Sequence, residues 1–90
     1  MPISREPYWT LAYVDEGTDL ACWMLFFGQG LKGLPKEVTD QIAPEDTAGA
    51  LEWAADEIEE LGLTIGAWEP HEPEPGTQRT YWTSIPVHNH

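Results

Sequence analysis

The sequence predicts a small α+β domain of order ββαββ, with one helix packed on a four-stranded, mostly antiparallel sheet. Two runs rich in aromatic and β-branched residues flank a short turn signal. One long segment then has helical periodicity, and two further apolar runs follow it. Because 90 residues are the length of one domain, residues 1–90 are expected to form a single acidic globular unit.

The first two predicted strands form a hairpin. Residues 8–14 (YWTLAYV) and 20–27 (LACWMLFF) flank a turn at 15–19, where a glycine can adopt a positive φ. The second run is apolar at both alternating sets of positions, so it is expected to be covered on both faces. Residues 28–43 contain three glycines and a proline and are predicted to be an irregular connection with a short helical turn around residues 36–41.

The predicted helix spans residues 44–61 (PEDTAGALEWAADEIEEL). Pro44 suits the first helical position, two acidic residues follow it at the positive end of the helix dipole, and Gly62 ends the helix. Apolar residues recur at spacings of three and four, and they are expected to form the packing face: Leu51, Ala54, Ala55, Ile58 and Leu61.

Residues 63–68 (LTIGAW) are the third predicted strand and residues 79–87 (RTYWTSIPV) the fourth. Residues 69–78 contain three prolines, so they are expected to form an extended loop that does not pair in a sheet. If the strands at 20–27 and 63–68 shared one sheet, the helix would join them by a right-handed crossover. One helix covers one face, so the other face is expected to be solvated or covered by loops or a partner.

Cysteine usage and hydropathy indicate a cytoplasmic protein. The single cysteine, Cys22, excludes an intrachain disulfide, and a reducing compartment is expected. Cys22 lies in an apolar run without basic neighbours, which indicates an unreactive core thiol. That run, residues 20–27, is too short to span a membrane, and the acidic residues before it do not fit a signal peptide.

Charge is the most informative property of the chain. Sixteen Asp and Glu accompany four Lys and Arg, for a net charge of −12. Residues 37–74 contain twelve acidic residues and no Lys or Arg, so this segment carries nearly all of the net charge. Direct binding to nucleic acid or to anionic membranes is not expected, because both are negatively charged.

Carboxylates gather on one side of the predicted helix. In helical projection one sector, opposite the packing face, contains Glu45, Glu52, Asp56, Glu59 and Glu60. Like charges four residues apart destabilise a helix by about 0.2–0.5 kcal/mol per pair, and Glu57 adds to the crowding at the negative end of the dipole. Trp53 lies beside these carboxylates, where it either anchors a partner or is covered by a loop. The simplest interpretation is a solvated face, but unfavourable local patterns without local gain are typical of functional sites.

Catalytic, cofactor and metal sites are not predicted. The serines lack a nucleophile motif, and the glycines of 28–43 do not have the spacing of a phosphate-binding loop. His71 lies among glutamates, and His88 and His90 end the sequence. None of these residues has the spacing of a zinc or calcium motif.

The features favour a non-enzymatic acidic binding or inhibitor protein that occupies a basic groove of a nucleic-acid-handling protein. It would act as a DNA or RNA mimic, of the anti-defence or immunity type. The predicted partner-binding residues are Glu45, Glu52, Trp53, Asp56, Glu57, Glu59 and Glu60. Two alternatives stay open: a small metal- or ligand-binding domain or enzyme that uses Asp, Glu and His, and a structural subunit that forms a homodimer through the uncovered sheet face.

Overall fold

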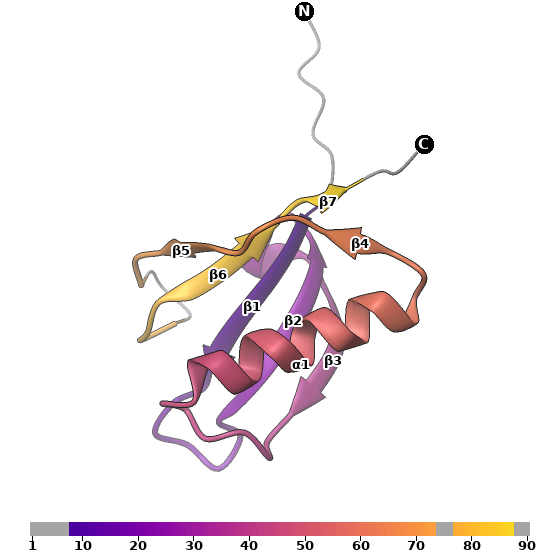
Figure 1. The fold of residues 1–90 in the computed structure, drawn as a ribbon. Helices are drawn as coiled ribbons and strands as arrows, with labels where there is room; N and C mark the ends of the chain where they lie inside the picture. The colour runs from indigo at the N-terminus through magenta and orange to yellow at the C-terminus, as the bar shows by residue number, and fades with distance from the viewer. Residues whose placement is uncertain (1–7, 74–76, 88–90) are drawn as a thin grey trace, which may run out of the picture.

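The computed structural model describes residues 8–73 and 77–87, with Pro86 and Val87 described by their backbone alone. One α-helix, α1 (Thr47–Glu60), lies across one face of an antiparallel sheet (Figure 1). In sheet order the strands are β3 (Leu34–Thr39), β2 (Cys22–Gly28), β1 (Tyr8–Val14), β6 (Tyr81–Ser84) and β5 (Glu69–His71). The predicted α+β class is confirmed, but the main sheet has five strands instead of four.

Strands β1 and β2 form the predicted hairpin. They pair along their whole length, with Tyr8 opposite Gly28 at one end and Val14 opposite Cys22 at the other. The second strand begins later than predicted, because residues 15–21 fold into the turn and leave Leu20 73% exposed. Strand β1 also pairs with β6, which makes it the central strand of the sheet.

Residues 28–43, predicted to be irregular, contain a 3₁₀ turn, η1 (Gly30–Lys32), and the edge strand β3. The helical turn predicted around residues 36–41 is wrong, because most of that segment lies in β3. Strand β3 pairs antiparallel with β2 and accommodates Pro35 opposite Phe26. A proline lacks the N–H of a ladder hydrogen bond, so it is tolerated at the sheet edge. The register shifts between Leu25 and Phe26, where β3 carries one extra residue as a bulge.

The prediction that residues 69–78 cannot pair is wrong. Strand β5 pairs antiparallel with β6, with Pro70 opposite Trp82 and His71 opposite Tyr81. Because β5 is the other edge of the sheet, Pro70 can turn the side that lacks an N–H away from the ladder.

The predicted third strand, 63–68, does not join the main sheet. Only β4 (Thr64–Ile65) forms there, and it pairs with β7 (Pro86–Val87) in a separate two-stranded sheet. The predicted fourth strand, 79–87, is divided between β6 and β7. Since the segments 20–27 and 63–68 lie in different sheets, no parallel crossover joins them.

Helix α1 is shorter than the predicted range 44–61. Asp46 is its N-cap, and the Asp46 carboxylate accepts a hydrogen bond from the Gly49 N–H at 3.0 Å. Capping of this kind places the first helical residue directly after Asp46. Pro44 therefore precedes the helix and does not occupy its first position.

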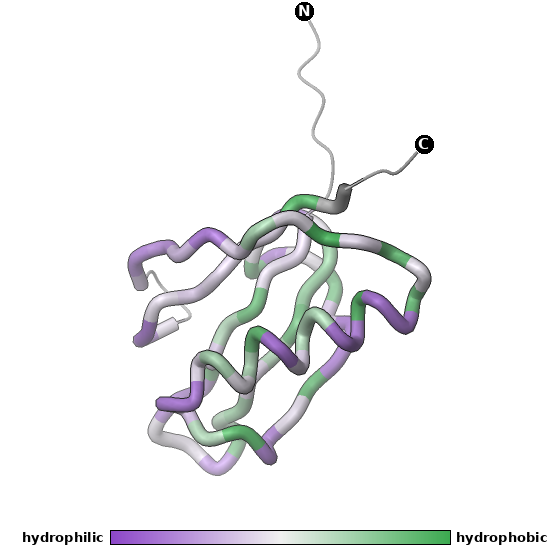
Figure 2. The backbone as a smooth tube through the Cα atoms, viewed as in Figure 1, coloured by the Kyte–Doolittle hydropathy of each residue, from purple (hydrophilic) through white to green (hydrophobic). Residues whose placement is uncertain are grey.

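The packing face of α1 is rotated from the predicted one. Leu51 and Ala55 are half-buried, and Leu61, at the C-cap, is 58% exposed. The fully buried residues are Ala50, Ala54 and Ile58. The centre of the packing face thus lies roughly 40° round the helix axis from the predicted stripe. This rotation brings Trp53 and Glu57 closer to the sheet. Figure 2 shows that hydrophilic and hydrophobic residues alternate along α1.

The core has two parts, one on each face of the sheet. The larger part lies beneath α1 and includes Trp9, Leu11, Tyr13, Trp23 and Leu25. The smaller part lies on the opposite face and consists of Ala12, Val14, Cys22 and Phe26. Leu31 of η1 and Tyr81 of β6 pack against this second part, so loop and strand residues partly cover the face without a helix. The prediction that the second strand is covered on both faces is confirmed.

Thr10, on the helix-free face of β1, is fully buried, and its hydroxyl has no hydrogen-bond partner among the described residues. Replacing such a buried polar group by an apolar group of the same shape removes the cost of its desolvation. We therefore expect Thr10→Val to leave the free energy of unfolding unchanged or to raise it by up to about 1 kcal/mol. Urea unfolding checks this, and a loss above about 1 kcal/mol would show that the hydroxyl is hydrogen-bonded.

Candidate functional site

Four of the predicted carboxylates line the outer side of α1. All four are exposed, and we call them the acidic face: Glu52, Asp56, Glu59 and Glu60. Over the described ranges 8–73 and 77–87, the structure has one ion pair, in which Arg79 Nε lies 2.8 Å from Glu16 Oε1. None of the four carboxylates of the acidic face forms an ion pair with a described lysine or arginine, although Lys36 lines a hollow together with Glu60.

Glu45 does not belong to this face. It precedes the N-cap of α1, so its position is not set by the helical projection used to predict it. Its negative charge acts on Arg79, whose pKa is raised first by a hydrogen bond to Glu16 and further by the charges of Glu16 and Glu45. Glu45 thus lies near Arg79 and not beside the acidic face.

Trp53 is neither fully exposed, as a partner anchor would be, nor fully covered by a loop. Its side chain is half-buried and packs against the core beneath α1, so the rotated helix covers part of the indole. The glycine-rich connection lies elsewhere, since η1 contacts β1 and β2. Part of the Trp53 surface stays available next to the acidic face.

A further carboxylate, Glu37, was not predicted at this site. The bulge in β3 pairs Glu37 with Leu25, and Leu25 belongs to the core beneath α1. The bulge places Glu37 opposite Leu25, while Lys36 lines the same hollow as Glu37, Glu57 and Glu60. No sequence signal marked this bulge, because residues 28–43 were expected to be an irregular connection.

Glu57 is the point at which the carboxylates of α1 and β3 meet. Burial is the largest cause that raises the pKa of Glu57, followed by the negative charges of Glu37, Glu60 and Asp56. A hydrogen bond between the Glu57 and Glu37 side chains raises this pKa further. Helix α1 and strand β3 thus bring the carboxylates of Glu57 and Glu37 together, and this proximity disfavours the charged form of Glu57.

This crowding predicts a pH dependence of stability. Because the pKa of Glu57 is raised on folding, the folded chain keeps a proton that the unfolded chain has lost. The contribution of this group to stability falls as pH rises through the folded pKa and is regained as pH falls toward the unfolded value. We expect the wild-type Tm to gain more than that of Glu57→Gln between about pH 7 and pH 4, because the contribution of Glu57 is fully regained only below the unfolded pKa.

Melting curves at both pH values check this expectation, with Glu72→Gln as the control that removes an exposed carboxylate away from α1. The control should keep the wild-type pH dependence. An identical pH dependence in wild type and Glu57→Gln would show that Glu57 is not crowded.

Two other predicted features have clear places. Cys22 is buried, and the pKa of its thiol is raised by burial and then by Asp15 and Asp40, which keeps it protonated, as predicted for a core residue. Within the described residues, no three His, Cys, Asp or Glu side chains are grouped to hold a metal ion. His88 and His90 lie outside the described residues.

In chemical terms, the site presents a row of negative charges beside an aromatic ring.

Among the described residues, no helix has the length and apolar character needed to cross a membrane. Comparisons with protein-family models, with curated proteins and with solved structures find no match to this chain.

Proposed function

We propose that this protein is a non-enzymatic inhibitor that places the acidic face of α1 in a basic groove of a nucleic-acid-handling protein. Residues four apart on a helix are separated by about 6 Å along its axis. Glu52, Asp56 and Glu60 therefore form an evenly spaced row of negative charges on a rigid element. A row of this kind can imitate consecutive phosphates, which basic grooves bind chiefly through Lys and Arg.

The observation that carries this proposal is the meeting of Glu57 and Glu37. Their crowding disfavours the charged state of Glu57, and neither carboxylate forms an ion pair with a described lysine or arginine, although Lys36 lines the same hollow. A basic surface on this side of the molecule would relieve the repulsion between these carboxylates. The repulsion that lowers the stability of the free protein would then favour formation of the complex.

The identity of the partner as a nucleic-acid-binding protein can be tested by displacement from DNA. Proteins of the native host are retained on immobilised duplex DNA at low salt, and the purified wild-type protein is then added. We expect the release of a discrete basic protein, because DNA and the acidic face compete for the same groove. If the wild-type protein releases nothing, the proposal is wrong.

Two variants make the displacement specific. The acidic-face variant combines Glu52→Gln, Asp56→Asn, Glu59→Gln and Glu60→Gln. The control variant neutralises four exposed carboxylates elsewhere, by Asp15→Asn, Asp19→Asn, Asp40→Asn and Glu72→Gln. Each variant has four fewer negative charges than the −12 of the unmodified chain. We expect the control variant to release the protein and the acidic-face variant to fail, and equal release by both would show that net charge alone acts.

A further inference from the structure

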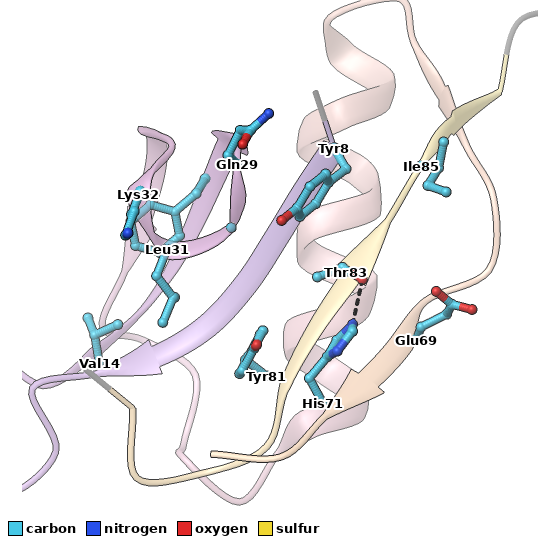
Figure 3. A pocket seen from close by; sticks show the side chains of 12 residues that line it. Tyr8, Val14, Gln29, Leu31, Lys32, Glu69, His71, Tyr81, Thr83 and Ile85 are labelled. Atoms are coloured by element: carbon cyan, nitrogen blue, oxygen red, sulfur yellow. Dashed lines mark hydrogen bonds between the residues drawn. The ribbon is translucent and has the colours of Figure 1, made fainter. Parts of the chain in front are cut away.

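The sheet face opposite α1 carries a groove with a volume of about 810 Å³. Figure 3 shows that η1 forms one wall and that β5 with β6 forms the other. Val14, Phe26 and Leu31 supply apolar surface, and Tyr8 lies between the two walls. Grooves that combine this size with an apolar lining and a few polar groups are typical of small-molecule sites.

The η1 wall depends on glycines. A Cβ at Gly33 would lie 2.7 Å from the Phe27 carbonyl oxygen, so only glycine allows the loop to return so close to β2. Gly30 has a φ of +62°, and a Cβ there would lie 3.3 Å from the Tyr8 hydroxyl. The loop built in this way places Gln29 and Lys32 at the groove.

The opposite wall is held by hydrogen bonding and stacking. His71 Nε2 lies 2.8 Å from Thr83 Oγ1, and this hydrogen bond fixes the imidazole ring (Figure 3). The same ring stacks on Tyr81 with a centroid distance of 5.1 Å and an interplanar angle of 14°. Both rings line the groove, so they form a fixed aromatic platform.

The groups at this groove favour a particular ligand class. Lys32 and Glu69 have opposite charges, so the lining is locally balanced while the whole chain carries −12, which repels anions. Aromatic rings stack with planar π systems, and the amide of Gln29 can both donate and accept hydrogen bonds. An uncharged planar ring with polar edge atoms satisfies each of these features.

We propose that the groove on the helix-free face binds an uncharged heteroaromatic compound of about the size of a nucleoside. Gln29 would hydrogen-bond the edge of its ring system, and Tyr8 and the His71–Tyr81 platform would contact its faces. The groove and α1 lie on opposite faces of the sheet, so this site is independent of the proposed inhibitor surface.

The test is an NMR titration of the full chain with adenosine as the probe. We expect saturable shifts confined to backbone amides of 29–32 and ring protons of His71 and Tyr81, with a Kd below about 1 mM. Adenosine monophosphate, which has the same ring and added negative charge, should bind more weakly. Maltose, which has hydroxyls and no aromatic ring, should cause no saturable shift.

Two groove variants and one control localise the binding. Tyr8→Leu and Gln29→Ala should each weaken adenosine binding by at least about fivefold, the scale of one stacking or hydrogen-bonding contact. Gln29 is exposed, so Gln29→Ala is expected to fold normally even if Tyr8→Leu does not. Glu52→Gln, on α1, should bind adenosine as the wild type does.

The proposal is wrong if adenosine causes no saturable shift, or if its shifts fall on α1. Stronger binding of adenosine monophosphate or of maltose would also overturn it, because the ligand would then be an anion or a sugar.

Discussion

Replacing Leu25 with alanine is expected to lower the free energy of unfolding by about 2–5 kcal/mol. Leu25 is 1% exposed and belongs to the core between the sheet and α1. It stands in β2, an inner strand that pairs with both β1 and β3, so neighbouring side chains cannot collapse easily into the space left by the truncation. Urea unfolding measured with an unchanged m-value gives the loss directly.

Val38→Ala is the matched control for Leu25→Ala. Val38 stands in the adjacent strand β3 but is 49% exposed, so its truncation should cost less than about 1 kcal/mol. A loss below about 0.5 kcal/mol for Leu25→Ala would contradict the fold, since truncating a side chain at the centre of the core lowers the free energy of unfolding by more than this.

Neutralising the acidic face is expected to have opposite effects on folding and on binding. In the free protein, the acidic-face variant removes like-charge pairs on α1, so its Tm should stay level or rise. Its association with the protein released from DNA should be at least about tenfold slower at low salt, because negative charges steer the encounter with a basic surface. Melting curves and binding time courses on the same samples measure both effects.

Trp53→Ala is expected to act on dissociation. Aromatic side chains next to charged rims are frequent binding anchors, and truncating one costs about 2 kcal/mol or more. Because Trp53 also packs against the core, the variant should be less stable than the wild type as well. An unchanged dissociation rate in a folded Trp53→Ala variant would assign the indole to the core alone.

Local patterns predicted the parts of the fold that depend on local forces. The segment 8–14 is a strand with the predicted bounds, and the continuous apolar run at 20–27 correctly indicated two covered faces. The edge strands were missed because Pro35 and Pro70 indicate loops. In the fold, each proline lies on a sheet edge where the missing N–H is tolerated.

The candidate site was predicted only where a single element determines it. Helical spacing placed Glu52 and Asp56 together, and both lie on the outer side of α1. Glu45 was assigned to the same side because the N-cap at Asp46 was not foreseen. Glu37 reaches the site through a bulge and a strand pairing that no local pattern encodes.

The most direct test of the proposed function is the association rate constant with the released DNA-binding protein at increasing salt. It is compared for the wild type, the acidic-face variant and the control variant. We expect fast association that falls steeply with salt for the wild type and the control variant, and slow, nearly salt-independent association for the acidic-face variant. If the acidic-face variant associates as fast as the wild type at low salt, these carboxylates are solvated surface and the phosphate-imitation account is contradicted.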